Sequence, residues 1–170
     1  SSKWYGYVYP KALDVISTPK IFTPDIAPNA SYAIDKTGDT FFTGGVSGGY
    51  GIKVKEGVSE LYILGLLNSK LLDWYLKQIS TQMRGGWYSY EAKYIKNLPI
   101  VLPRTKLVKD EIVKLVETML QLQQQKASTT LPDQLQQLEQ RIAHTDDKIN
   151  EKVYALYGLS EEEIKLVEGK

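Results

Sequence analysis

The chain has 170 residues and a mass of 19.2 kDa, which suits one compact domain or two small lobes rather than a multidomain enzyme. It contains no cysteine and one histidine, so disulfide scaffolds, zinc knuckles and thiol catalysis are largely excluded. The formal net charge is +1 and 42% of the residues are apolar, as in ordinary globular proteins. Because no apolar stretch reaches the length of a membrane span and no signal peptide opens the chain, we expect a cytoplasmic protein without membrane contact.

The composition changes near residue 100. Residues 1–100 contain 16 of the 18 aromatic residues and carry 11 Lys/Arg against 8 Asp/Glu, a net charge of +3. Residues 101–170 carry 10 against 12, a net charge of −2. Pro99 and Pro103 forbid a continuous helix across the junction. We therefore predict two regions, residues 1–100 and residues 101–170.

The first region begins with short strand-like segments at residues 4–9, 20–22, 31–34, 40–43 and 52–55. The third and fourth segments flank a five-residue turn with Gly38 near its end, a pattern typical of a β-hairpin. Glycines crowd residues 44–51 and lead into the last of these strands. From Ser59 the apolar residues recur every three or four positions, which indicates helix as far as Ile79. Asn68 and Ser69 are N-cap types, so we expect two consecutive helices.

A loop over residues 84–90 and a short helix over residues 91–96 complete the first region. The second region shows two heptad-like apolar patterns, separated by a break at residues 127–130. Pro132 suits a first helical turn, and these features predict an antiparallel helical hairpin. Gly158 ends its second helix, and Ser160 with Glu163 forms a capping box for a short last helix. The predicted fold class is α+β: a small mixed or antiparallel sheet with packed helices, followed by this hairpin and the C-terminal helix.

The sequence contains no convincing catalytic or metal site. The glycine-dense segment lacks the lysine of a phosphate-binding loop, and it precedes a strand rather than the helix that a dinucleotide fingerprint requires. Asp25, Glu91 and Lys93 would suit a metal-dependent nuclease, although such sets arise often by chance. The single histidine, His144, lies between charged positions on a helical face and is interpreted as a surface residue.

Binding is better supported than catalysis. Between residues 44 and 94, glycine-rich loops stand beside aromatic residues with lysines and an arginine interleaved. Aromatic faces stack or wedge against bases, Arg and Lys meet phosphates or guanine edges, and glycines permit close backbone approach. A core of aromatics with solvated lysines is the simpler alternative. The loop that starts at Arg84 carries the strongest indication of function.

Five motifs occur in an order that resembles a known family: PKI at residues 19–21, FTGG at 42–45, YILGLLNSKLL at 62–72, RGGWY at 84–88 and YIKNLPI at 94–100. The order is similar to that of the TaqI-like C-terminal specificity domain. This target recognition domain closes type IIG restriction-modification enzymes and Eco57I-like adenine-specific DNA methyltransferases. DKINEKVY at residues 147–154 and LYGL at 156–159 resemble the usual end of these chains.

The resemblance implies sequence-specific recognition of double-stranded DNA by a non-catalytic domain. It also implies an upstream methyltransferase domain of the same polypeptide, absent from this sequence, which would bind the cofactor S-adenosylmethionine. No cofactor or metal is expected in this chain, and we expect a monomer. The residues expected to contact DNA are Lys20, Gly44, Gly45, Tyr50, Lys53, Arg84, Trp87, Tyr88, Tyr90 and Lys93. The helical region resembles the spacer helices of type I specificity subunits, and the alternative function is a helical protein-docking module without DNA readout.

Overall fold

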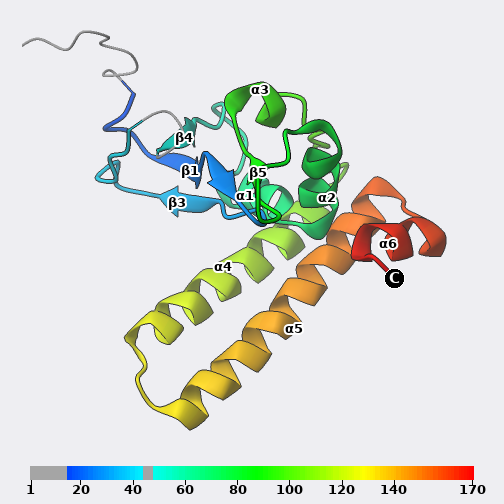
Figure 1. Ribbon diagram of the computed structural model, residues 1–170. Helices are drawn as coiled ribbons and strands as arrows, with labels where there is room; N and C mark the ends of the chain where they lie inside the picture. Colours follow the sequence, from blue (N-terminus) through cyan, green and yellow to red (C-terminus); the bar gives the residue numbers. More distant parts are fainter. Residues whose placement is uncertain (1–14, 44–47) are drawn as a thin grey trace, which may run out of the picture.

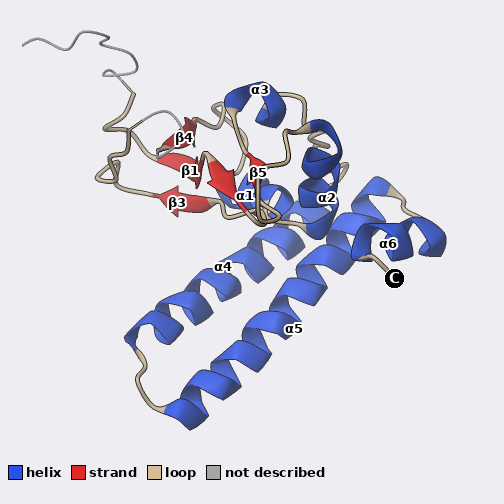
Figure 2. Ribbon diagram, in the orientation of Figure 1, coloured by secondary structure: helices blue, strands red, loops and turns tan. Residues whose placement is uncertain are grey.

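The computed structural model describes residues 15–43 and 48–170 (Figure 1). A mixed body is followed by a long helical arm, formed by α4 (Lys106–Ser128) and α5 (Pro132–Tyr157). Figure 2 shows that the strands belong to the body and that the two arm helices run side by side away from it. The predicted α+β fold with a helical hairpin is confirmed.

The body contains a small antiparallel sheet with β1 (Lys20–Pro24) in the centre. On its two sides lie β3 (Ala33–Asp35) and β4 (Gly49–Ile52). Ile21 of β1 stands opposite a residue of each neighbour and is fully buried. A second, two-stranded sheet pairs β2 (Ile26–Ala27) with β5 (Tyr88–Ser89), which joins the start of the body to a segment 60 residues later.

The hairpin predicted between residues 31–34 and 40–43 is wrong, because β3 pairs with β1. The carboxylate of Asp35 explains the difference. It accepts hydrogen bonds from the backbone N–H groups of Thr37, Gly38 and Thr40, at 3.2, 2.8 and 2.8 Å. The Asp35 side chain thereby stabilises the turn at residues 35–40, as Asp does in Asx turns, and no pairing between residues 31–34 and 40–43 is needed to hold it. The predicted strand at residues 4–9 lies outside the described residues.

Two consecutive helices follow the sheet, as predicted. They are α1 (Glu60–Leu67) and α2 (Lys70–Ile79), and each begins after a serine whose hydroxyl accepts a backbone N–H from the first turn. The predicted short helix is present as α3 (Ala92–Ile95). None of the helices in residues 15–43 and 48–170 combines the length and apolarity needed to cross a bilayer.

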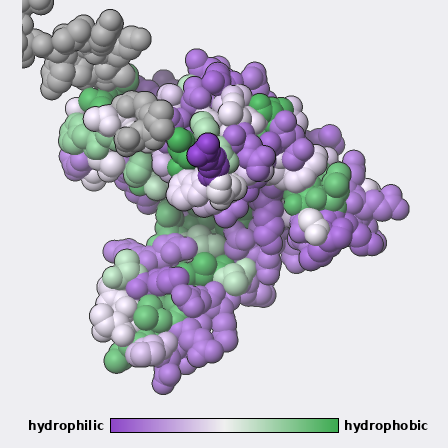
Figure 3. All heavy atoms as spheres, in the orientation of Figure 1, coloured by the Kyte–Doolittle hydropathy of each residue, from purple (hydrophilic) through white to green (hydrophobic). Residues whose placement is uncertain are grey.

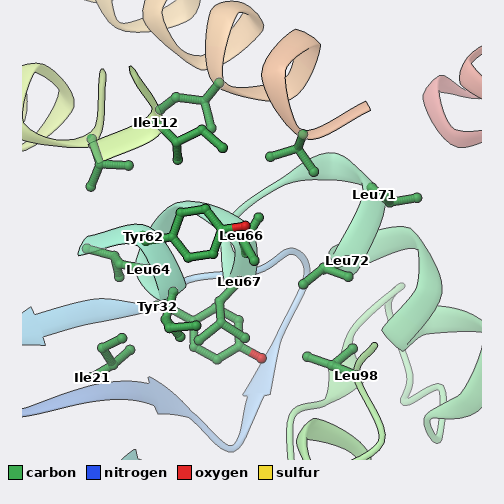
Figure 4. Packing of buried hydrophobic residues seen from close by; sticks show 14 of the residues in the cluster. Ile21, Tyr32, Tyr62, Leu64, Leu66, Leu67, Leu71, Leu72, Leu98 and Ile112 are labelled. Atoms are coloured by element: carbon green, nitrogen blue, oxygen red, sulfur yellow. The ribbon is translucent and has the colours of Figure 1, made fainter. Parts of the chain in front are cut away.

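Helix α1 occupies the centre of the hydrophobic core. Figure 4 shows Tyr62 and Leu66 of α1 facing Ile112 of α4 on one side, while Ile21 and Tyr32 lie on the other. Four of these side chains are at most 1% exposed: Tyr62, Leu66, Ile112 and Ile21. The arm and the sheet are therefore held together by one shared layer of side chains rather than by a flexible linker.

The base of the arm is also tied to the body by hydrogen bonds. The Tyr62 hydroxyl donates to the Val101 carbonyl at 2.8 Å, and the Tyr157 hydroxyl donates to the Pro99 carbonyl at 2.6 Å. The final helix α6 (Glu161–Glu168) begins with the predicted capping box of Ser160. Because residues 1–100 and 101–170 share one core, their division into separate domains stays a prediction.

The arm extends well beyond these attachments. In Figure 3 it forms a separate projection, on which hydrophobic residues are interspersed among hydrophilic ones. Only a few apolar side chains of its outer half are buried, among them Leu122 of α4 and Leu138 of α5. The outer half consequently presents a polar surface to solvent.

Candidate nucleic-acid interface

A short β-hairpin between α2 and α3 carries the loop that the sequence singled out; we call it the 81–89 hairpin. The backbone N–H of Met83 donates to the Trp87 carbonyl at 2.7 Å, and the N–H of Ser89 donates to the Thr81 carbonyl at 3.1 Å. These bonds leave residues 84–86 as a three-residue turn. The sequence predicted a loop here, and the structure gives it the regular geometry of a hairpin tip.

Two glycines make this tip possible. Gly85 and Gly86 have φ angles of 79° and 78°, in the left-handed region that L-residues with a side chain seldom adopt. A Cβ on Gly85 would lie 3.5 Å from the Trp87 indole, so this ring packs beside the turn. Arg84 is exposed at the tip and makes no ion pair with any described residue. The hairpin thus presents one free guanidinium beside an indole.

The apolar side chains of the tip are also accessible. Trp87 is 45% exposed and Met83 is 37% exposed, on the two paired strands of the hairpin. Large apolar groups at an exposed tip cost solubility, and together with a free arginine they are typical of a surface that binds a partner. Met83 was missed from the sequence; its position directly before the arginine and opposite the indole becomes visible only once the hairpin pairing is known.

The rear of the hairpin is fixed by Tyr90, which is fully buried. Its hydroxyl donates to Asp73 Oδ1 at 2.5 Å, and the same oxygen accepts the backbone N–H of Ala30 at 2.9 Å. Burial first, and then this hydrogen bond, raise the pKa of Tyr90, so the phenol stays protonated. The predicted DNA contact of Tyr90 does not fit this position: the residue supports the hairpin from inside the core.

Tyr88 occupies an intermediate position. It is half-buried in β5, and the ammonium of Lys77 lies 5.4 Å from the centre of its ring, a cation–π contact. The same ammonium pairs with Asp73 at 2.7 Å. Asp73 therefore connects α2 to both Tyr88 and Tyr90. This role was missed from the sequence, because its partners lie up to 43 residues away and no local pattern marks them.

The cations near β4 form a second group. Lys53 follows β4 directly and is exposed, as is Lys55, and neither makes an ion pair with a described residue. Tyr50 lies half-buried in β4 opposite Thr23. Burial, together with the negative charges of Asp25 and Glu91, raises the pKa of Tyr50. The predicted residue Tyr50 therefore lies within β4 and is partly covered, while Lys53 directly follows the strand and is exposed to solvent.

Lys93 lies close to Tyr50, and its ammonium already has partners in the structure. Its ammonium is 3.0 Å from Glu91 Oε1 and 4.8 Å from the centre of the Tyr94 ring. Hydrogen bonds from Lys93 and then Ser89 lower the pKa of Glu91, which keeps that carboxylate charged. Lys93 is still exposed, so its ammonium can exchange this partner for a phosphate.

The set that would suit a metal-dependent nuclease lies close together, since Glu91 and Lys93 both influence Asp25. Burial, followed by the charge of Glu91, raises the pKa of Asp25, and the charge of Lys93 opposes this. Asp25 is 5% exposed, and its Oδ1 has no hydrogen-bond partner among the described residues. Residues 15–43 and 48–170 contain no group of three or more His, Cys, Asp or Glu that could hold a metal ion. The Glu91 carboxylate of this set is already bound by Lys93 and Ser89.

Lys20 lies away from any surface. It is 4% exposed, and its ammonium is 2.7 Å from Asp35 Oδ2 and donates to the Ile16 carbonyl at 2.8 Å. The predicted DNA contact of Lys20 does not fit this burial, because its charge is already used to balance the carboxylate that holds the 35–40 turn. Gly44 and Gly45 lie outside the described residues.

The structure thus brings Arg84 and Trp87 to one hairpin tip, places Tyr50, Lys53 and Lys93 around β4 and α3, and assigns Lys20 and Tyr90 to the interior. A family model described as the TaqI-like C-terminal specificity domain matches residues 2–100. The chain belongs to this family. No curated protein matches the chain. The matched residues include the sheet, α1 to α3 and the whole 81–89 hairpin. The family is one of specificity domains, which are non-catalytic.

Proposed function

We propose that this specificity domain recognises a short sequence in double-stranded DNA and directs a separate catalytic domain to it. The observation that carries the proposal is the 81–89 hairpin, where the free guanidinium of Arg84 stands beside the exposed indole of Trp87. A hairpin tip of this kind fits the major groove of B-DNA, which admits a two-stranded ribbon. Arginine is the side chain most often used to read guanine, through O6 and N7.

The rigid support of the hairpin favours readout of bases over loose attachment. The Tyr90–Asp73 hydrogen bond and the pairing of β5 with β2 fix the C-terminal end of the hairpin to the core. A reading side chain must be held to within a fraction of an ångström to discriminate between bases. Lys53 and Lys93 would supply the accompanying phosphate contacts, which position a protein on the duplex without reading sequence.

The modest positive charge of residues 1–100 has a consequence for affinity. With a net charge of +3, this region can neutralise few phosphates, and we expect a shallow dependence of binding on salt. The catalytic domain would supply the remaining contacts to the duplex. We propose that it belongs to a restriction-modification enzyme and methylates adenine with S-adenosylmethionine; no residue of the present chain is assigned to that cofactor.

Selection from a randomised duplex pool tests the proposal. The domain should enrich one short motif, and enrichment of none at low salt would reject it. Arg84→Ala should then relax one position of the motif and cost about 1–3 kcal/mol there. Arg104→Ala is the matched control, because Arg104 is also exposed and free of ion pairs with described residues but lies at the base of the arm. A loss that is uniform over all sequences would instead make Arg84 a phosphate contact.

A second candidate function rests on the arm. Helices α4 and α5 extend far beyond their contacts with the body, and the ends that meet at the 129–131 loop lie outside the core around α1. We propose that this projection, the helical hairpin of α4 and α5, docks the catalytic domain. The rigid attachment of the helical hairpin to the DNA-reading body is in keeping with this role. Shortening both helices by two matched turns at the 129–131 loop should leave the enriched DNA motif unchanged and abolish co-purification with a methyltransferase domain. Retained co-purification would reject the docking role.

A further inference from the structure

A pocket between β4, α1 and α3 is not used by the proposed hairpin contact. Its volume is about 520 Å³, within the range of small-molecule sites. Ile63 and Leu67 of α1 form its floor and are almost fully buried, while Ile95 of α3 forms part of a wall. Figure 4 shows Leu67, the last residue of α1, in the core, so the floor of the pocket is part of the hydrophobic centre of the domain.

The charged groups that line the pocket are both lysines. They are Lys55 and Lys96, and neither ammonium makes an ion pair with a described residue. Tyr50 contributes the remaining polar side chain, a phenol that can donate or accept a hydrogen bond. No carboxylate is among its described lining residues; Glu91, which directly precedes the lining residue Ala92, is already bound by Lys93 and Ser89.

Apolar walls with two free cations define the chemistry of a ligand. The apolar part must be compact enough for the pocket, and an anionic group must lie near the two ammonium groups. A nucleobase with its phosphate has this construction, because the face of a base can lie against apolar side chains while lysines bind the phosphate. The lysines would remain uncompensated around an entirely apolar ligand.

We propose that the β4–α3 pocket binds a single nucleotide, with the base against Ile63, Leu67 and Ile95 and the phosphate between Lys55 and Lys96. The same chemistry is available from two sources. One is a free nucleoside monophosphate. The other is a nucleotide turned out of the bound duplex, at a cost of a few kcal/mol for unstacking and unpairing. The second source rests on the proposed DNA-binding function, and the first does not.

The free nucleotide is tested by methyl NMR on the whole chain. Thymidine monophosphate should shift the methyl signals of Ile63, Leu67 and Ile95, thymidine should bind at least about tenfold more weakly, and inorganic phosphate should leave these methyls unmoved. The double variant Lys55→Gln/Lys96→Gln should reduce nucleotide affinity about tenfold or more. Lys36→Gln is the matched control, since Lys36 is exposed and free of ion pairs with described residues but does not line the pocket.

The extruded nucleotide is tested with duplexes that carry 2-aminopurine at successive positions of the enriched motif. Its fluorescence should rise at one position on binding, and the Lys55/Lys96 variant should reduce that rise while the control Lys36→Gln should not. Ala92→Leu, which fills the pocket from α3, should block both arms. The proposal is overturned if neither thymidine monophosphate nor a bound duplex shifts the three methyls. Duplex binding without those shifts from either ligand rejects the pocket alone, whereas nucleotide binding without duplex binding rejects the proposed function alone.

Discussion

Asn150 of the arm accepts a hydrogen bond of 2.8 Å, through its Oδ1, from the backbone N–H of Lys70 at the start of α2. The two residues are 80 positions apart. An amide on α5 thereby satisfies one of the N–H groups that the first turn of a helix leaves without a partner. The Asn150 amide nitrogen donates in turn to the Asp146 carbonyl at 2.9 Å, which fixes its orientation.

Asn150→Ala should therefore lower the free energy of unfolding by about 1–2 kcal/mol, because a buried N–H loses its acceptor. Urea unfolding followed by circular dichroism measures the change. Gln140→Ala on the same helix is exposed and should stay within about 0.5 kcal/mol of the wild type. Equal effects of the two substitutions would show that Asn150 matters only through helix α5 itself.

Gly65 of α1 allows α4 to approach closely. A Cβ at this position would lie 2.7 Å from Cγ2 of Val116 and 3.2 Å from Cγ2 of Ile112. Gly65→Ala should destabilise the domain by about 1–2 kcal/mol, since overpacking outweighs the better helix propensity of alanine. The double variant Gly65→Ala/Val116→Ala should lose less than the sum of the two single variants, measured by the same unfolding transitions. Additive losses would contradict a direct clash.

Features that depend on a few neighbouring residues were predicted correctly from the sequence. Ser69 caps α2, and Ser160 with Glu163 caps α6, because a cap needs only a side chain and the next turn of backbone. The loop predicted over residues 84–90 is present as a turn at residues 84–86, whereas Tyr88 and Ser89 of the same range form β5. The helical hairpin followed from its apolar period and from Pro132.

Features that depend on distant partners were not predicted. Lys20 resembles a surface cation in the sequence, and only its pairing with Asp35 across β1 and β3 reveals that it is buried. Tyr90 likewise resembles the aromatic residues of the hairpin tip until Asp73 is known to hold its hydroxyl. Polarity and spacing can nominate residues for a binding surface, but burial is decided by contacts that the chain makes 15 or more residues away.

The buried pair of Lys20 and Asp35 should contribute strongly to stability. Asp35→Asn leaves the ammonium without a charge partner in the core, and we expect the Tm to fall by about 10 °C at pH 7. Asp147→Asn removes an exposed pair with Lys70, whose side chains are 63% and 42% exposed, and should change the Tm by no more than about 2 °C. Differential scanning calorimetry measures both. Similar losses in the two variants would contradict a special role for the buried pair.

The same pair predicts how stability depends on pH. The hydrogen bond from Lys20, followed by backbone N–H groups, lowers the pKa of Asp35 below its usual value. A lowered folded-state pKa means that the stabilising contribution is complete above the unfolded pKa, near 3.8, and is lost as the pH falls below it. The Tm difference between wild type and Asp35→Asn should therefore be constant from pH 7 to 5 and shrink below about pH 4. A difference that is unchanged at pH 3 would contradict the ionised pair.

Asp25 should show the opposite behaviour. Its pKa is raised, first by burial, so ionisation of Asp25 at neutral pH opposes folding. Asp25→Asn should raise the Tm at pH 7 by roughly 2–4 °C, and the gain should diminish as the pH falls and the wild-type carboxyl becomes protonated. Asp39→Asn, at an exposed position, is the control and should leave the Tm unchanged within about 1 °C. A fall in the Tm of Asp25→Asn would show that the carboxylate has a stabilising partner.

Alanine replacements at Gly86, in the tip of the 81–89 hairpin, and at Gly57 distinguish an effect on DNA binding from an effect on stability. Gly86 and Gly57 have φ angles of 78° and 82°, and a Cβ at either position would meet nothing within 4 Å. Replacement by alanine should therefore cost both variants a similar free energy of unfolding, about 1 kcal/mol, from the left-handed backbone alone. Only Gly86→Ala should weaken binding to the enriched duplex, by roughly tenfold, because it moves Arg84 relative to the groove. Equal duplex affinities of the two variants, measured by fluorescence anisotropy, would place the DNA contact elsewhere on the domain.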